Sequence, residues 1–230
     1  MWNQRAARAR FLAGRYAASR EVLIFYAGLA EWQGRVARKV TAVDDLDKIF
    51  PSLLDLVAQT GPALLREAAG TLRADHRQKL LEDYWERRVP AAPLDFFARA
   101  ALQPYAASLP ANRECPWCSL PPQAGALLPQ GEGLALELVC ALCLRRRPFP
   151  RARCPGCNES TEAKLPGFST PDFAHLRLQA CDTCQGYFQL VDLSRDPSAL
   201  PEVDELAGLP LDLWAAEQGY HKLHLNLAGI

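Results

Sequence analysis

Four short stretches decide the fold of this chain: Cys115-Pro-Trp-Cys118, Cys140-Ala-Leu-Cys143, Cys154-Pro-Gly-Cys157 and Cys181-Asp-Thr-Cys184. Together they hold all eight cysteines of the 230 residues. Two residues between the cysteines of a pair allow a tight turn to direct both sulfur atoms at one metal ion. A soft divalent metal takes four thiolates at the corners of a tetrahedron, about 2.3 Å away. Four pairs therefore supply the ligands for two metal ions.

An internal repeat indicates which pairs share a metal. The first and third pairs are Cys-Pro-x-Cys, and the intervals that follow them, Cys118 to Cys140 and Cys157 to Cys181, contain 21 and 23 residues. Each interval ends in alternating small or apolar residues, which predict a strand leading into the next pair. We therefore predict tandem sites, with an interleaved pairing of the same spacings as the alternative. The predicted ligands are Cys115, Cys118, Cys140 and Cys143 in site 1, and Cys154, Cys157, Cys181 and Cys184 in site 2.

A disulfide framework and a thiol redox site are the alternatives to metal binding. No apolar signal segment begins the chain, and a chain of this length builds a core without disulfides, so we disfavour the first. Cys115-Pro-Trp-Cys118 resembles the glutaredoxin-type motif. The βαβ pattern expected around that motif is missing, however, and three further pairs would stay unexplained. Two thiolate metal sites are the favoured interpretation.

Composition and motifs disfavour several functional classes. Hydrophobic residues make up 49% and charged residues 23%, and the 26 basic residues balance 26 acidic ones. This balance indicates neither a general nucleic-acid binder nor a membrane-surface protein. No apolar run approaches the roughly 20 residues that span a bilayer. We expect a cytoplasmic protein without membrane insertion.

Catalytic motifs are scarce in the sequence. It contains no Gly-rich phosphate loop, no Gly-x-Ser-x-Gly elbow and no His-Glu-x-x-His helix. A metal with four cysteine ligands has no open position for water or substrate. We therefore predict that the protein is not an enzyme.

Residues 1–110 are predicted to form a helical domain. Residues 1–20 carry five arginines and no acidic residue, a pattern of transit peptides that we interpret as a basic helix face. Ser19 is a candidate N-cap for the helix that follows. Pro51 is expected to interrupt the next helix, after which Ser52 caps a new one. The predicted helices after residue 20 are 22–36, 46–50, 53–59, 63–72, 75–89 and 94–107.

The rest of the chain is predicted to hold the metal units and a tail. The first unit is expected at 111–148, the second at 149–195, and a C-terminal helix with its tail at 196–230. Pro197 and Pro201 are expected in a loop, and a helix at 211–218. The predicted fold is α+β: a helical N-terminal domain, two tandem rubredoxin-like or zinc-ribbon units and a short C-terminal helix. His175, His221 and His224 are expected to be spare, because eight cysteines fill two tetrahedral sites.

One basic cluster lies between the two units. It contains Arg145, Arg146, Arg147, Arg151 and Arg153. These arginines are candidates to neutralise the thiolate sites, to contact a protein partner, or to bind nucleic acid phosphates. Because basic and acidic residues are equally numerous around them, nucleic-acid binding is the least favoured of these three roles.

The cysteine pairs and their neighbours also carry a family resemblance. The stretches Leu-Val-Cys140-Ala-Leu-Cys143, Arg-Cys154-Pro-Gly-Cys157 and Ala-Cys181-Asp-Thr-Cys184-Gln-Gly-Tyr-Phe, together with the first pair, resemble the formate dehydrogenase accessory (FdhE-like) family. The resemblance extends to Phe25-Tyr-Ala-Gly-Leu-Ala-Glu-Trp-Gln33, to Leu209-Pro-Leu-Asp-Leu-Trp214 and to Asn226-Leu-Ala-Gly229.

This resemblance implies a cytoplasmic maturation factor that binds the catalytic subunit of formate dehydrogenase before its export. It also implies that the eight cysteines ligate two metal ions, with iron favoured. Zinc is the alternative, since rubredoxin pairs are often followed directly by glycine and here Ser119, Leu144, Asn158 and Gln185 stand in that position. The other hypotheses are a zinc-ribbon nucleic-acid binder that uses Arg145 to Arg153, and a rubredoxin-like electron-transfer protein. The oligomeric state is not predicted.

Overall fold

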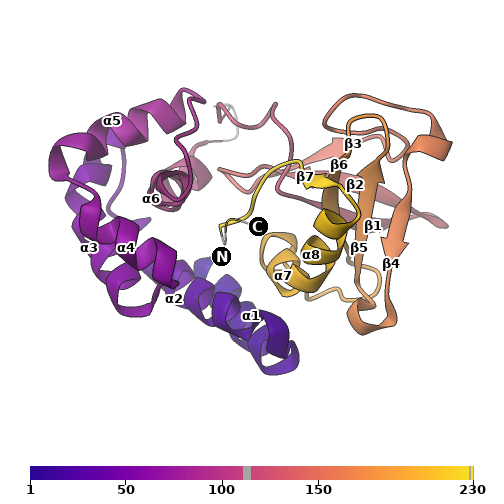
Figure 1. The fold of residues 1–230 in the computed structure, drawn as a ribbon, viewed down its shortest axis with the longest axis horizontal. Coiled ribbons are helices and arrows are strands. Elements are labelled where there is room, and N and C mark those ends of the chain that lie inside the picture. The colour runs from indigo at the N-terminus through magenta and orange to yellow at the C-terminus, as the bar shows by residue number, and fades with distance from the viewer. Residues whose placement is uncertain (111–114, 228, 230) are drawn as a thin grey trace.

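The N-terminal half of the chain is helical and the C-terminal half is built on one sheet (Figure 1). The computed structural model describes residues 1–110, 115–227 and 229, so the predicted start of the first metal unit, at 111–114, lies outside the described residues. The helices of the first half are α1 (Trp2–Arg15), α2 (Arg20–Val36), α3 (Leu46–Thr60), α4 (Ala63–Thr71), α5 (Ala74–Trp85) and α6 (Leu94–Ser108). Short 3-10 turns lie at Ala17–Ser19 and Val43–Asp45.

Helix α6 lies at the centre of the helical half. Every side chain from Phe96 to Ala106 is buried, and the helix contacts α2, α3 and α5. Most of these side chains are small or apolar, and the buried Arg99 and Gln103 are hydrogen-bonded, so neighbours can cover the helix on all sides. Helix α2 buries Phe25, Leu29 and Trp32, which recur with the 3.6-residue period of one helix face, while Val22 at its start is half-buried.

Helix α3 continues through Pro51, so the predicted interruption there is wrong. A proline inside a helix costs about 3 kcal/mol. The neighbouring Phe50 and Leu53 are fully buried, and each buried side chain of this size contributes about 1.5–3 kcal/mol. Ser52 does not begin a new helix. Its hydroxyl donates to the carbonyl oxygen of Ile49 at 2.6 Å.

Ser19 precedes α2 as predicted, but it does not cap the helix. Its hydroxyl instead donates to the carbonyl oxygen of Ala207 at 2.8 Å. Ala207 ends α7 (Pro201–Ala207), a helix that the sequence analysis placed in a loop. Pro201 stands in its first turn, where a proline loses no helical hydrogen bond. Helix α8 (Leu209–Glu217) follows, close to the predicted range.

The sheet combines two three-stranded antiparallel units. The strands are β1 (Ala124–Gln130), β2 (Gly133–Val139), β3 (Arg146–Phe149), β4 (Gly167–Ser169), β5 (Leu176–Cys181), β6 (Gly186–Asp192) and the short β7 (His221–Lys222). Further 3-10 turns lie at Glu162–Lys164 and Pro171–Phe173. The order is β3-β2-β1-β6-β5-β4, with β7 beside β6. The two units are joined by parallel pairing of β1 with β6, from Ala124 opposite Gln189 to Leu127 opposite Asp192.

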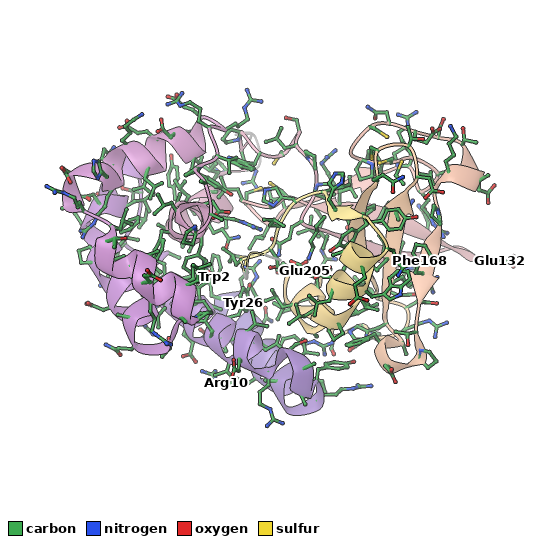
Figure 2. The ribbon with its side chains drawn as sticks, viewed as in Figure 1. Trp2, Arg10, Tyr26, Glu132, Phe168 and Glu205 are labelled. Carbon is green, nitrogen blue, oxygen red and sulfur yellow. The ribbon has the colours of Figure 1, made fainter. Side chains whose placement is uncertain are left out.

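Helix α7 lies between the sheet and the N-terminal helices. All seven of its residues are buried, and it contacts α1, α2, β1 and β6. Its carboxylates meet cations from both sides: Arg5 pairs with Glu202 at 2.6 Å, and Lys222 pairs with Glu205 at 2.8 Å. Glu205 lies near the middle of the molecule (Figure 2). Burial raises the pKa of Glu205, and the ion pair with Lys222 opposes that shift.

The predicted fold class is confirmed. The molecule has a helical N-terminal part, two tandem strand units that each carry two cysteine pairs, and C-terminal helices. The strands β2 and β5 each lead into the second cysteine pair of their unit, as the alternating residues predicted.

Candidate metal centres

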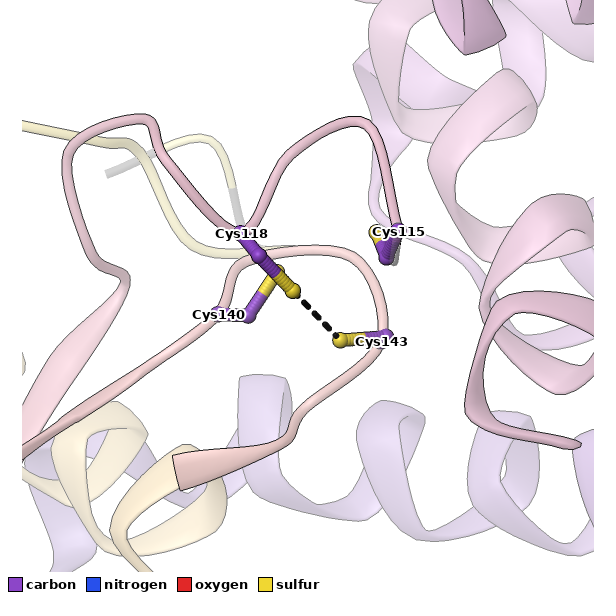
Figure 3. Close-up of side chains that lie close together, drawn as sticks. All are labelled: Cys115, Cys118, Cys140 and Cys143. Carbon is purple, nitrogen blue, oxygen red and sulfur yellow. Dashed lines mark hydrogen bonds between the residues drawn. The ribbon is translucent and has the colours of Figure 1, made fainter. Parts of the chain in front are cut away.

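The first candidate centre, cluster 1, consists of Cys115, Cys118, Cys140 and Cys143 (Figure 3). Their four sulfur atoms all lie within 4.8 Å of one another, and those of Cys118 and Cys143 are 3.5 Å apart. Cys115 and Cys118 lie on a turn in which the amide of Cys118 donates to the carbonyl oxygen of Cys115 at 3.1 Å. The other two cysteines lie on the turn between β2 and β3.

The second candidate centre, cluster 2, consists of Cys154, Cys157, Cys181 and Cys184, again within 4.8 Å of one another. Its sulfur atoms are 3.7 Å apart between Cys154 and Cys184 and 3.6 Å apart between Cys157 and Cys181. Consecutive pairs along the chain are therefore brought together. The interleaved arrangement is not formed.

Both clusters fit a thiolate-bound metal ion. Four sulfurs about 2.3 Å from a central ion form a tetrahedron with edges of about 3.8 Å, close to the sulfur separations of 3.5, 3.7 and 3.6 Å. A disulfide would need a sulfur–sulfur distance of about 2.05 Å, and all eight cysteines are free. Four soft donors suit zinc and iron alike, so the donor set does not distinguish these two metals.

The turns keep their shape although glycine does not follow the cysteines. Leu144, Asn158 and Gln185 adopt left-handed φ angles of 60°, 66° and 56°. The amide of Leu144 donates to the carbonyl oxygen of Cys140 at 3.1 Å, and that of Asn158 to Cys154 at 3.0 Å. These hydrogen bonds close the turns and hold side-chain-bearing residues in a conformation that glycine adopts more easily.

Hydrogen bonds also favour the thiolate form at individual sulfurs. The amide of Gly156 donates to the sulfur of Cys154 at 3.3 Å. The thiols of Cys115 and Cys143, together with the backbone amides of Cys143 and Leu142, lower the pKa of Cys140 against the opposing effect of burial. The pKa values of Cys115, Cys143, Cys154 and Cys184 are raised instead. Since metals bind thiolates and not thiols, binding of a metal ion must displace protons from these thiols.

The first turn of cluster 1 is inserted into the helical half. Trp117, between Cys115 and Cys118, is buried and stacks on Tyr84 of α5 with ring centroids 4.5 Å apart. The indole Nε1 of Trp117 donates to the carbonyl oxygen of Tyr84 at 3.0 Å. The ring of His224 packs against the indole in a T-shaped arrangement, with centroids 5.4 Å apart.

The second turn of cluster 1 is held by α6. The carbonyl oxygen of Ala141, between Cys140 and Cys143, accepts hydrogen bonds from Arg99 Nε at 3.0 Å and from Gln103 Nε2 at 3.1 Å. The guanidinium of Arg99 also donates to the carbonyl oxygen of Leu225 and to the side chain of Gln123. One buried arginine therefore joins α6, the cluster 1 turn, the start of β1 and the C-terminal segment.

Cluster 2 is covered on one side by the C-terminal segment. A Cβ atom added at Gly156 or Gly186 would lie 2.6 Å or 2.4 Å from Leu223 Cδ2, so a side chain at either position would require this leucine to shift. The hydroxyl of Tyr220 donates to Asp182 at 2.7 Å. Cys154 and Cys181 are buried, whereas Cys157 is exposed and Cys184 is half-buried, so the cluster is open to solvent on the side of Cys157.

The predicted basic cluster does not form one surface. Arg146 and Arg147 are neighbours on β3, so their side chains point to opposite faces of the sheet. Arg145 donates to the carbonyl oxygen of Leu109, and Arg147 and Arg151 donate to backbone carbonyls within the sheet unit. Arg146, Arg151 and Arg153 are exposed.

The histidines lie outside both clusters, as expected for spare residues. His175 is buried and lies 2.8 Å from Asp204 of α7. His175, Asp196 and Asp204 place donor atoms within 4.8 Å of one another, and Arg8 binds both carboxylates. This group fastens α1 to the C-terminal part. Burial and the nearby Arg99 charge lower the pKa of His224 to about 3.

Sequence reasoning missed the residues that support cluster 1 from the helices. Arg99 and Gln103 interrupt the apolar face of α6, and a polar residue within such a face is a usable signal of a buried partner. Tyr84 gave no comparable signal, because an aromatic residue on a helix face is ordinary core. The partner of each residue depends on how the helices pack against the sheet.

No helix in the described part of the chain is both long enough and apolar enough to cross a bilayer.

Comparisons with known proteins agree with this architecture. The family described as "FdhE, C-terminal domain" matches residues 152–228. A "Protein FdhE homolog" of Aquifex aeolicus is 28% identical over 214 residues, which cover 86% of this chain and 75% of that protein. A "Protein FdhE homolog" of Pseudomonas putida is 31% identical over 155 residues, which cover 60% of this chain and about half (49%) of that protein. The crystal structure of the FdhE protein from Pseudomonas aeruginosa is similar with a TM-score of 0.73 and 25% identity, covering 99% of this chain and 94% of that one.

Proposed function

We propose that this chain belongs to the FdhE family and is a metal-binding accessory factor required for the assembly of active formate dehydrogenase. The observation that carries the proposal is the pair of four-cysteine clusters on one sheet, in a chain whose fold matches a family member over almost its whole length. Accessory proteins of this kind act by binding, and the clusters are suited to shape a binding surface.

The client in this proposal is the catalytic subunit of formate dehydrogenase, bound in the cytoplasm before export. The accessory factor itself is not catalytic. Four thiolates fill the coordination sphere of a tetrahedral metal and leave no position for a substrate. The sheet and its two clusters then act as a scaffold whose shape depends on the metals.

Each cluster is proposed to hold one metal ion, with iron favoured and zinc as the alternative. The proposed ligands are Cys115, Cys118, Cys140 and Cys143 for the first ion, and Cys154, Cys157, Cys181 and Cys184 for the second. Among the five arginines proposed for partner contact, Arg146, Arg151 and Arg153 are the exposed ones and are the better candidates. Arg145 and Arg147 are half-buried and bond to backbone carbonyls of their own chain, which makes a structural role more fitting for them. Arg151 makes one such bond but stays exposed.

A pull-down experiment tests the proposal. The tagged protein, purified without oxygen, is incubated with the catalytic subunit of formate dehydrogenase, and the retained subunit is quantified together with bound metal. We expect two metal ions per chain and retention of the client. Replacement of Cys115 and Cys154 by serine should abolish both. Client binding by a folded, metal-free variant would refute the metal-dependent part, and failure of the wild-type protein to bind would refute the client.

Rubredoxin-like electron transfer is the second candidate function, because the exposure of Cys157 brings one cluster to the surface. It requires bound iron that cycles reversibly between the ferrous and ferric states. Cyclic voltammetry on the purified protein tests this directly. A protein that binds only zinc excludes it.

A further inference from the structure

The two clusters differ in their relation to the hydrophobic core. Cys115, Cys140 and Cys143 are only 3%, 4% and 3% exposed and belong to the core that also contains the inner faces of the N-terminal helices. Cys118 packs against that core. Cys154 and Cys181 of cluster 2 are equally buried, at 3% and 1% exposed, but among the residues that the structure describes no cysteine of cluster 2 belongs to that core, and Cys157 is exposed. Cluster 1 is therefore part of the interior, whereas cluster 2 lies at its margin.

Both turns of cluster 1 are fastened to the helical half. Trp117 of the first turn stacks on Tyr84 and donates to its carbonyl oxygen. Ala141 of the second turn accepts from Arg99 and Gln103. Each contact is made by a residue that stands between two cysteines of the cluster. If the cysteines were not drawn together, neither turn would keep the shape that these contacts need.

Cluster 2 has a different set of neighbours. Its turns are held by Leu223 and Tyr220 of the C-terminal segment, and by a hydrogen bond of 2.6 Å from Thr183 to Glu159. Across the described residues, no hydrogen bond or ring contact joins these turns to helices α1 to α6. One end of the cluster, at Cys157, is open to solvent.

We propose that the two clusters have separate roles: a metal in cluster 1 fastens α5 and α6 to the sheet, whereas a metal in cluster 2 exchanges with solution. This inference rests on the proposed binding of metal by both clusters. In this proposal, cluster 1 joins the two halves of the molecule. Cluster 2 lies at the surface, where chelators, other metal ions and partner side chains can reach its thiolates.

The physical reason lies in what must open before a metal leaves. Release from cluster 1 requires at least one turn to move, and that movement breaks packing in the main core. Release from cluster 2 requires only a local opening near Cys157. Local openings cost much less free energy than openings that disrupt a core, so they are more frequent. The metal of cluster 2 is therefore expected to exchange at least about tenfold faster than that of cluster 1. A tenfold ratio corresponds to a difference of about 1.4 kcal/mol in the free energy of opening.

The first test uses the unaltered holoprotein. A chromophoric chelator is added in excess, and iodoacetamide labelling followed by mass spectrometry records which cysteines become reactive. We expect two equal phases of metal release, with Cys157 and Cys184 alkylated in the fast phase and Cys115, Cys140 and Cys143 in the slow one. A single phase, or early alkylation of cluster 1, overturns the assignment.

The second test uses a matched pair of variants. Cys118→Ser and Cys157→Ser each remove the second cysteine of a Cys-Pro-x-Cys turn, one in each cluster. Hydrogen exchange should show amides of α5 and α6 losing protection about tenfold or more in Cys118→Ser and keeping it in Cys157→Ser. Equal effects of the two changes overturn the proposal. If the unaltered protein purifies without metal, metal binding itself is refuted. If the two clusters release metal at different rates but the protein does not bind the catalytic subunit, this inference stands and the proposed client is refuted.

Discussion

The indole of Trp117 stacks on the phenol ring of Tyr84, with centroids 4.5 Å apart and planes inclined by 12°. Trp117 comes from a cysteine pair and Tyr84 from a helix 33 residues earlier in the chain. The contact therefore connects the state of a metal cluster to the packing of the helical half.

Removal of the Trp117 side chain is expected to destabilise the protein strongly. The indole is 3% exposed, and Trp117→Ala should lower the free energy of unfolding by about 3–5 kcal/mol through the cavity that it leaves. Trp117→Phe keeps a ring for stacking but loses the hydrogen bond to Tyr84, so a smaller loss of about 1–2 kcal/mol is expected. Urea denaturation of the metal-loaded proteins measures both. Equal stability of the two variants would show that the ring stacking contributes nothing.

Arg99 is expected to be irreplaceable by lysine. Arg99 is 3% exposed, and its guanidinium donates hydrogen bonds to oxygen atoms of Ala141, Leu225 and Gln123. A lysine ammonium lacks the planar fork that reaches all three acceptors. The carbonyl oxygen of Ala141 keeps Gln103 as a donor, whereas the side-chain oxygen of Gln123 loses the donor that Arg99 supplies. A buried acceptor left without a donor costs about 1–3 kcal/mol, so Arg99→Lys should lower the free energy of unfolding by about 2 kcal/mol. Arg38→Ala, at an exposed position, is the control and should stay within about 0.5 kcal/mol of the parent. Thermal denaturation of both variants decides the point.

Gly186 is expected to tolerate no side chain while Leu223 is present. A Cβ atom there would lie 2.4 Å from Leu223 Cδ2 and 3.2 Å from the sulfur of Cys184. Gly186→Ala should therefore cost about 1–3 kcal/mol through overpacking and weaken metal binding by cluster 2. Leu223→Ala in the same chain removes the clash, so the double variant should bind the metal better than Gly186→Ala alone.

A double-mutant cycle on metal affinity and stability measures this coupling. Gly70→Ala is the control, because a Cβ atom at this helical glycine meets nothing within 4 Å. It should raise stability by about 0.5–1 kcal/mol. Strictly additive effects of Gly186→Ala and Leu223→Ala would contradict the contact.

Arg87 is a position where glycine should increase stability. The residue follows α5 with a left-handed φ of 67° and is exposed. A side chain in this conformation costs about 1–2 kcal/mol relative to glycine, and the greater freedom of glycine in the unfolded chain offsets part of the gain. Arg87→Gly should raise the free energy of unfolding by about 0.5–1 kcal/mol, whereas Arg87→Ala should not. Urea denaturation compares the three proteins.

Acid is expected to weaken the attachment of α1 through Asp196. Burial raises the pKa of this carboxyl, but hydrogen bonds from Ser198 and Arg8 and the charge of Arg8 outweigh it and lower the pKa from 3.8 to about 2. The folded state therefore favours the carboxylate. Its contribution is fully present above the unfolded pKa near 4 and is lost as the pH falls toward 2, by up to about 2 kcal/mol. Asp196→Asn should lack this part of the pH dependence. Unfolding free energies of both proteins between pH 6 and pH 3 test it.

The sequence by itself determined the local and periodic features of this protein. The spacing within each cysteine pair is short enough that a single turn brings both sulfurs together, and the internal repeat assigned consecutive pairs to one cluster. The strands that lead to Cys140 and Cys181 followed from small or apolar residues at every second position. The helices followed from a period of 3.6 residues, because burial of one helix face repeats along the chain.

Only the tertiary structure decided how the two halves are joined. Pro51 stays within a helix because burial of its neighbours outweighs the local preference of proline. Pro201 begins a helix, which its fixed φ permits, but the packing of α7 decides that a helix forms there. The buried carboxylates of α7 meet Arg5 and Arg8 across more than half of the chain. No local pattern encodes such a partner, since any buried carboxylate needs a cation but its own sequence does not say which one. The same holds for Tyr84 and Arg99 at cluster 1: their roles arise from the packing of helices on the sheet, which brings together residues that the chain keeps far apart.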